Sequence, residues 1–189
     1  NSRRAELELK VDGMNPLPPP SVSASAIVDA MRRSGIDHVT TTPDFVQLSV
    51  HSRLDAPDSG IRSIYCANEN QALQMATGLI IGGARPAVMM QNQGLYNCGN
   101  SLRACGLDAR MPLFMMIGQF GREFANVGHD PRLSRRRMVS LLLPVLDAMG
   151  VRHWLLESND DLGVFEQAWQ HGRRQQAPTA VIVGHTTEW

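Results

Sequence analysis

Three polar segments of this sequence carry side chains that can bind a ligand or transfer a proton. Each directly follows a short apolar stretch. The segments read Thr41-Thr42-Pro43-Asp44, Ala67-Asn68-Glu69-Asn70-Gln71 and Gln91-Asn92-Gln93-Gly94-Leu95-Tyr96-Asn97. Carboxylates accept protons, whereas amide side chains both donate and accept hydrogen bonds. We therefore expect acid–base chemistry or polar ligand binding where these segments meet.

Glu69 is the catalytic candidate that stands out. Its neighbours Ala67, Ala72 and Ala76 are apolar, and an apolar setting helps a carboxyl group to keep a proton. The alternative is an ordinary glutamate in the first turn of a helix, where the helix dipole favours negative charge. Residue types alone favour this second interpretation.

Alternating apolar and amphipathic stretches must position these segments. The pattern predicts strands over 38–41, 61–66, 87–91, 113–117, 152–156 and 179–183. It predicts helices from Ser21 or Ser23 to Gly35 and over 68–81, 132–149 and 160–174, and a loop over 92–99. This alternation indicates an α/β fold of three layers, α/β/α, with a six-stranded parallel sheet. In such sheets ligands bind at the carboxyl ends of the strands.

Length and charge limit the class of protein. The 189 residues suit one domain, expected over 21–189. Residues 1–20 are expected to be an N-terminal extension or linker, with an edge strand over 5–11 and a stiff proline spacer. The part before Met14 could be vector sequence. A formal net charge of zero argues against nucleic-acid binding. No apolar run approaches the ~20 residues of a membrane span, and the absence of a signal core predicts a cytoplasmic protein.

Common catalytic signatures are missing. The sequence has no G-x-G-x-x-G, no G-x-x-x-x-G-K-[ST] and no G-x-S-x-G. Paired cysteines and H-x-x-x-H spacing are also missing, so we expect no metal site in this chain. Cys66 could be a nucleophile beside His129 and Asp130, but a cysteine at the end of a buried strand more often serves packing.

The polar segments resemble those of one enzyme family. Ala67-Asn68-Glu69, with Ala72, resembles the A-N-E-x-x-A segment of phosphonopyruvate decarboxylases. The segment from Met90 to Asn97 is similar to the M-Q-N-S-G-L-G-N segment that these enzymes share with sulfopyruvate decarboxylases. Thr42-Pro43-Asp44 falls where the family has V-P-D after its first strand. The resemblance, over about residues 22–184, implies a thiamine diphosphate-dependent enzyme and its pyrimidine-binding domain.

The resemblance implies a specific role for Glu69. In the family, the matching glutamate hydrogen-bonds N1′ of the aminopyrimidine and so promotes removal of the thiazolium C2 proton. The resulting ylide attacks a 2-oxo acid, and the thiazolium ring accepts electrons as carbon dioxide leaves. The residues expected to contact the cofactor are Glu69, Gln91, Asn92, Gly94 and Leu95.

The substrate side departs from the family pattern. Phosphonopyruvate decarboxylases have W-R-G-E after the fourth strand, where this chain has Gln119-Phe120-Gly121-Arg122-Glu123. Phe120 replaces the arginine that would meet a phosphonate, although Arg122 could bind a carboxylate. We expect a small 2-oxo acid whose far end need not be phosphonate or sulfonate. The residues expected to contact it are Thr42, Asp44, Gln93, Tyr96, Asn97, Phe120, Arg122 and His129.

The resemblance also implies a partner chain. The family holds magnesium and diphosphate with a G-D-G…N motif in a second domain, and this sequence has no Gly-Asp dipeptide. Sulfopyruvate decarboxylases divide the two domains between chains. We therefore expect a diphosphate-binding (beta) subunit as partner, thiamine diphosphate and Mg2+ as cofactors, and a hetero-oligomer. A carboligase subunit and a non-catalytic regulatory module stay open as alternatives, although the presence of Glu69 argues against the second.

Overall fold

Six apolar stretches form a parallel sheet in the computed structural model, which describes residues 22–189. The strands are β1 (His38–Thr41), β2 (Arg62–Tyr65), β3 (Pro86–Gln91), β4 (Phe114–Gly118), β5 (Arg152–Leu156) and β6 (Thr179–Val183). Their order across the sheet is β2-β1-β3-β4-β6-β5, with every pairing parallel. The predicted six-stranded α/β fold is confirmed. The extension expected over 1–20 lies outside the described residues.

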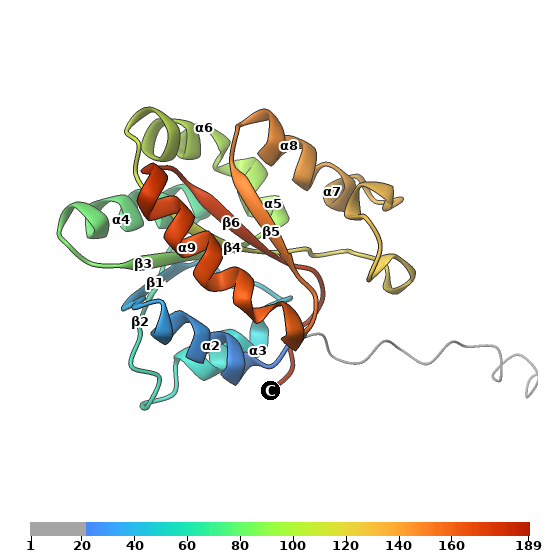
Figure 1. Cartoon of the computed structure of the whole chain (residues 1–189), viewed down its shortest axis with the longest axis horizontal. Helices are drawn as coiled ribbons and strands as arrows, with labels where there is room; N and C mark the ends of the chain where they lie inside the picture. The colour runs from blue at the N-terminus through green and yellow to red at the C-terminus, as the bar shows by residue number, and fades with distance from the viewer. Residues whose placement is uncertain (1–21) are drawn as a thin grey trace, which may run out of the picture.

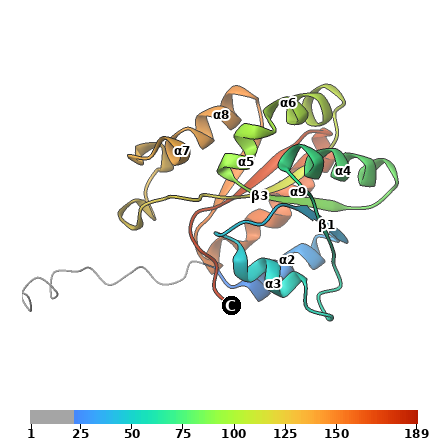
Figure 2. The same ribbon diagram turned by 180° about the vertical axis from the view of Figure 1, so that it is seen from behind.

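Helices cover both faces of the sheet (Figures 1 and 2). One face carries α2 (Ala24–Arg33), α3 (Leu48–Leu54) and α9 (Val164–Gln175). The other carries α4 (Glu69–Ile81), α5 (Asn92–Asn97), α6 (Gly99–Ser101), the π-helix Leu102–Asp108, α7 (Arg137–Ser140) and α8 (Leu142–Ala148). Because both faces of the central strands are covered, these strands are apolar throughout rather than alternating.

Local signals in the sequence set where two of the helices begin and end. Ser23 caps α2, since its Oγ accepts a hydrogen bond from the backbone N–H of Ala26 at 3.4 Å. Gly35 follows the helix with a φ of +78°, a left-handed conformation that favours glycine. Asn68 caps α4 by accepting from the backbone N–H of Gln71 at 3.0 Å. These three positions agree with the sequence prediction.

Two predicted segments are wrong. The segment 92–99, expected to be a loop, instead contains α5. Its Gly94 is required by close packing against Glu69 and not by a turn. The expected helix over 132–149 is divided into a short 3-10 helix (Pro131–Leu133), α7 and α8. Pro144 cannot donate a backbone hydrogen bond, so it is tolerated in the first turn of α8 but not in the interior of one long helix. Helix α3 and the π-helix were not predicted.

The strand order places the functional segments at one edge of the sheet. From β1 the chain moves outward to β2, and then returns to form β3 on the other side of β1. The carboxyl ends of β1, β2 and β3 therefore lie next to one another at the point where the strand order reverses, the usual ligand position in open α/β sheets. Among the described residues, no helix has the length and apolar character needed to cross a membrane.

Candidate active site

The carboxylate of Glu69 is held by residues from two other segments. Thr42, directly after β1, donates its hydroxyl to Glu69 Oε1 at 3.3 Å. Asn97, at the end of α5, donates its side-chain amide to Glu69 Oε2 at 3.1 Å. Glu69 itself is half-buried at the start of α4. The three polar segments singled out from the sequence thus converge on one carboxylate that remains partly accessible.

Gly94 leaves the space that Glu69 occupies. A Cβ atom at position 94 would overlap Glu69 Cγ and lie 2.7 Å from Glu69 Oε1. Distances this short do not occur between a real Cβ atom and its neighbours, so any larger residue would displace the carboxylate. The glycine of α5 therefore fixes the position of Glu69 relative to the strand ends.

Asp44 is buried beneath the end of β4. It is 2% exposed, and its Oδ1 accepts a hydrogen bond from the backbone N–H of Val46 at 2.8 Å. Its Oδ2 accepts from the Gln47 amide at 2.6 Å. Burial raises the pKa of the Asp44 carboxyl, and these hydrogen bonds oppose the shift in part. A Cβ atom on Gly118 would lie 3.0 Å from Asp44 Oδ1, so this glycine makes room for the acid.

Asn92 and Tyr96 connect α5 to the neighbouring loops. Asn92 is fully buried and donates to the carbonyl oxygens of Phe120 and Met138, at 3.0 and 2.8 Å. The Tyr96 hydroxyl also donates to Met138, at 2.8 Å, and burial raises the pKa of Tyr96 to about 12. Leu95 packs in the core, whereas Gln93 is exposed. Asn92, Leu95 and Tyr96 therefore hold the structure around the site rather than facing an open cleft.

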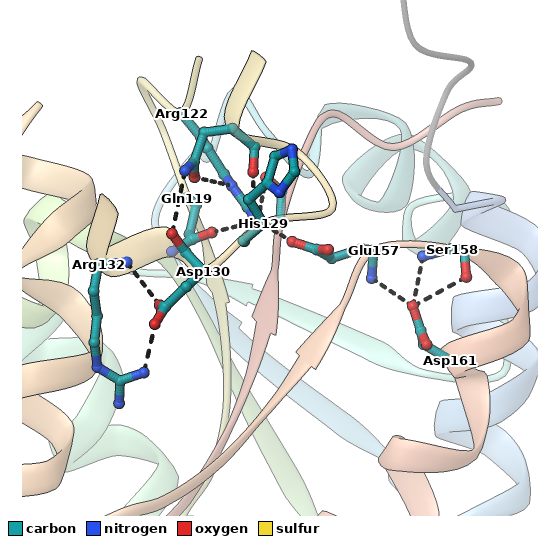
Figure 3. Close-up of polar contacts among 10 residues, drawn as sticks. Gln119, Arg122, His129, Asp130, Arg132, Glu157, Ser158 and Asp161 are labelled. Atoms are coloured by element: carbon teal, nitrogen blue, oxygen red, sulfur yellow. Dashed lines mark hydrogen bonds and ion pairs between the residues drawn. The ribbon is translucent and has the colours of Figure 1, made fainter. Parts of the chain in front are cut away.

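Arg122, in the loop after β4, is enclosed by hydrogen-bond acceptors (Figure 3). Its side chain is 1% exposed and forms an ion pair with Glu157. The guanidinium also donates to Asn126 Oδ1 at 3.0 Å, to Gln119 Oε1 at 3.0 Å and to the His129 carbonyl at 2.8 Å. With these N–H groups engaged inside the protein, Arg122 anchors the loop after β4 to the ends of β5 and β6. His129 contributes its backbone carbonyl to this network, and its side chain is exposed.

The thiol interpretation of Cys66 gains no geometric support. Cys66 directly follows β2, at one end of the sheet order, whereas Arg122 ties His129 to the β5–β6 end. Burial raises the pKa of the Cys66 thiol, which lowers the fraction of reactive thiolate. Within residues 22–189, no three His, Cys, Asp or Glu side chains form a group that could hold a metal ion.

A large cavity opens beside these residues. Its volume is about 980 Å³, and it extends from the carboxyl ends of β1, β3 and β4 along one face of α3. The residues that line it are Pro43, Asp44, Phe45, Leu48, His51, Ser52, Asp55, Ala56, Tyr65, Gln91, Phe120 and Trp189. Of the residues expected from the sequence, the cavity brings together Asp44, Gln91 and Phe120. The sequence analysis missed Phe45, Leu48, His51 and Tyr65, although the spacing of 48, 51, 52 and 55 is that of one helix face.

Three curated proteins match about half of the chain. Sulfopyruvate decarboxylase subunit alpha from Methanococcus maripaludis is 29% identical over 99 residues, which is 52% of this chain and 59% of that protein. The protein of the same name from Methanothermobacter thermautotrophicus is 29% identical over 101 residues, 53% of this chain and 61% of that protein. The chain thus matches about three fifths of the length of these relatives.

Solved structures share the fold. A thiamine diphosphate-dependent 4-hydroxybenzoylformate decarboxylase from Rhodococcus jostii RHA1 superposes with a TM-score of 0.65 at 20% identity, covering 88% of this chain and 31% of that one. A 2-oxoglutarate:ferredoxin oxidoreductase from Magnetococcus marinus gives a TM-score of 0.63 at 12% identity, covering 90% of this chain and 30% of that one. At these identities, the likeness establishes the arrangement of strands and helices.

A family model covers the segments that build the site. Residues 23–138 match the model described as thiamine pyrophosphate enzyme, N-terminal TPP binding domain. This match includes Thr42, Glu69, Gly94 and Asn97, the residues that surround the carboxylate, and more than half of the chain. The chain therefore belongs to the family of N-terminal TPP-binding domains of thiamine pyrophosphate enzymes.

Proposed function

We propose that this chain is the pyrimidine-side subunit of a two-subunit, thiamine diphosphate-dependent decarboxylase of 2-oxo acids. The observation that carries the proposal is the half-buried carboxylate of Glu69, held at the carboxyl edge of the sheet by Thr42 and Asn97. Membership of the TPP-binding family supports the choice of cofactor. The relatives named sulfopyruvate decarboxylase subunit alpha support both the reaction and the division into subunits.

The residues present fit the pyrimidine end of the cofactor. Glu69 would hold N1′ of the aminopyrimidine, because an accessible carboxylate that is fixed from both sides can share a proton with a ring nitrogen. Gln91, at the rim of the cavity, would contact the cofactor or the 2-oxo acid from the end of β3. When bound, thiamine diphosphate supplies the electron sink for cleavage of the carbon–carbon bond.

The surrounding side chains have distinct tasks in this proposal. Thr42 and Asn97 orient the carboxylate of Glu69, which holds the proton at Oε1 or Oε2. Gly94 keeps α5 close enough for this arrangement. Phe45 and Phe120, whose rings meet edge to face with centroids 6.2 Å apart, would contact the 2-oxo acid and shield it from water once it is bound.

The experiment that tests the proposal is co-purification of the tagged chain from its native host, followed by an assay of carbon dioxide release. We expect a partner that carries a G-D-G…N motif, and release that needs a 2-oxo acid, thiamine diphosphate and Mg2+. An added aldehyde acceptor distinguishes the carboligase, which would form a hydroxyketone. The proposal is contradicted if a complex with such a partner binds the cofactor and consumes no 2-oxo acid.

A further inference from the structure

The cavity beside α3 reaches from Gln91 at the end of β3 to Tyr65 at the end of β2, the strand at one edge of the sheet. Tyr65 of β2 and Met89 of β3 both pair with Thr41, on opposite sides of β1. Strands β2 and β3 are therefore two strand spacings apart, which is about 10 Å. Tyr65 lies at the far end of the cavity, and Gln91, the last residue of β3, lies at the near end. This leaves room for a ring-sized group between the strand ends and His51.

Apolar and aromatic side chains make up much of the cavity wall. Five large apolar or aromatic residues that line it are exposed: Phe45 (66%), Leu48 (52%), Tyr65 (51%), Phe120 (36%) and Trp189 (77%). Among the described residues that line the cavity, none is Lys or Arg, whereas Asp44 and Asp55 are acidic. A sulfonate, phosphonate or second carboxylate in this cavity would meet no opposite charge. An uncharged aromatic group would bury the exposed rings.

One buried polar atom at the far end, Nε2 of His51, lacks a hydrogen-bond partner among the described residues. His51 as a whole is 7% exposed. Burial lowers the pKa of His51, which favours the neutral imidazole with one donor and one acceptor nitrogen. Tyr65 lies beside it, with ring centroids 6.2 Å apart, and donates its hydroxyl to Asp55 Oδ2 at 2.6 Å. The Tyr65 oxygen therefore keeps acceptor capacity for a further hydrogen bond.

We propose that this cavity binds the tail of the 2-oxo acid, that the tail is an uncharged aromatic ring with a polar substituent, and that His51 and Tyr65 recognise that substituent. This inference rests on the proposed function and specifies its substrate class. An unpartnered buried polar group is unfavourable, so a ligand that supplies the missing hydrogen bond gains affinity over one that does not. His51 is then a specificity-determining residue that does not touch the reacting atoms.

The test compares three 2-oxo acids on the co-purified complex with thiamine diphosphate and Mg2+. We expect kcat/KM for 4-hydroxyphenylpyruvate to exceed that for phenylpyruvate by about three- to tenfold, the usual effect of one hydrogen bond. We expect both to exceed sulfopyruvate by at least about tenfold. A preference for sulfopyruvate would overturn the inference while leaving the proposed decarboxylation intact.

Variants locate the effect in the cavity. His51→Leu should lower kcat/KM for the hydroxylated acid about three- to tenfold more than for phenylpyruvate, and His51→Gln should restore part of that difference. Leu48→Arg, at a position that is 52% exposed, should shift the preference toward sulfopyruvate by placing a cation in the cavity. The matched control is Ile81→Arg, which adds the same charge at a 71% exposed position of α4 outside the cavity and should not change the preference. Equal effects of the two arginines would overturn the inference.

A binding experiment separates the two proposals. 4-Hydroxyphenylacetate has the ring and hydroxyl but no 2-oxo acid to decarboxylate, so its titration into the isolated chain reports only on the cavity. We expect binding that is weakened in His51→Leu. If no 2-oxo acid is decarboxylated, the proposed function is wrong, but this titration still shows whether the cavity binds a hydroxylated aromatic ring. If 4-hydroxyphenylacetate does not bind, the assignment of the tail to the cavity is wrong.

Discussion

Glu69 of α4 packs against Gly94 of α5, at a point where α5 has no side chain. A Cβ atom at position 94 would lie 2.7 Å from Glu69 Oε1 and would overlap the Glu69 side chain. The two residues are 25 positions apart in sequence and lie on helices that follow β2 and β3. The position of the proposed catalytic carboxylate therefore depends on a glycine in another segment.

Gly94→Ala should displace Glu69 and impair function. We expect a loss of about 1–3 kcal/mol in the free energy of unfolding, which is typical of overpacking, and at least about tenfold lower decarboxylation by the complex. Chemical denaturation and carbon dioxide release measure the two effects.

Gly99→Ala is the matched control for Gly94→Ala. Gly99 lies five residues further on, and a Cβ atom there would meet nothing within 4 Å. Its stability should remain within about 0.5 kcal/mol of the wild type. Equal stability and activity of the two alanine variants would show that Glu69 does not need the space at residue 94.

Asp44 should make the folded state less stable as pH rises. Its folded-state pKa lies above the ordinary 3.8, because burial disfavours the carboxylate. The folded protein therefore retains a proton that the unfolded chain releases, so the contribution of Asp44 is most favourable below about pH 4 and declines as pH rises through the folded-state pKa. The measurement is the free energy of unfolding of the wild type and of Asp44→Asn between pH 4 and 8.

The comparison with Asp44→Asn isolates the contribution of the Asp44 carboxyl to the pH dependence of stability, because the other titrating groups are common to both proteins. We expect the stability of the wild type relative to the variant to fall with increasing pH. Gln47 can turn its unpartnered Oε1 toward an amide at position 44, so the variant should fold. A relative stability that rises with pH would contradict the assigned direction.

Arg122 should act as a structural anchor. Arg122→Lys keeps the positive charge but cannot reach the acceptors that surround the guanidinium, and it leaves Glu157 and the nearby carbonyl groups poorly paired. We expect a loss of about 3 kcal/mol in the free energy of unfolding, in the range for breaking a buried ion pair. Arg135→Lys, at an exposed position, should change stability little. If Arg122→Lys changes only the KM for the 2-oxo acid, Arg122 binds substrate as the sequence first indicated.

The strands and the segment around Glu69 could be predicted because their signals are local. Apolar runs bounded by polar and glycine residues marked all six strands to within about two residues, and Asn68 marked the start of α4. The segment 92–99 was wrongly predicted to be a loop, because a glycine among amides is typical of a loop. The actual constraint on Gly94 comes from Glu69, a contact between distant segments that no local pattern reveals.

The site residues likewise divide into those with a local sequence signal and those whose role depends on contacts between distant segments. Glu69 was proposed from its place after a strand and from the resemblance of its segment to a known family. The enclosure of Arg122 depends on Glu157 and Asn126, whose positions in the sequence do not reveal the contact. His51 gave no signal because a single histidine on a helix face is common. Only the cavity and the unpartnered Nε2 distinguish it.

The measurement that tests the central claim most directly is hydrogen–deuterium exchange at the thiazolium C2 of thiamine diphosphate bound to the assembled enzyme. Glu69→Gln keeps the size of the side chain and can still form hydrogen bonds, but an amide cannot take up and release the proton that Glu69 shares with the cofactor. We predict that exchange and turnover fall by at least about 10²-fold in the variant, the usual scale for a positioned acid–base group, with the fold unchanged. Exchange in Glu69→Gln at the wild-type rate would contradict the role assigned to Glu69.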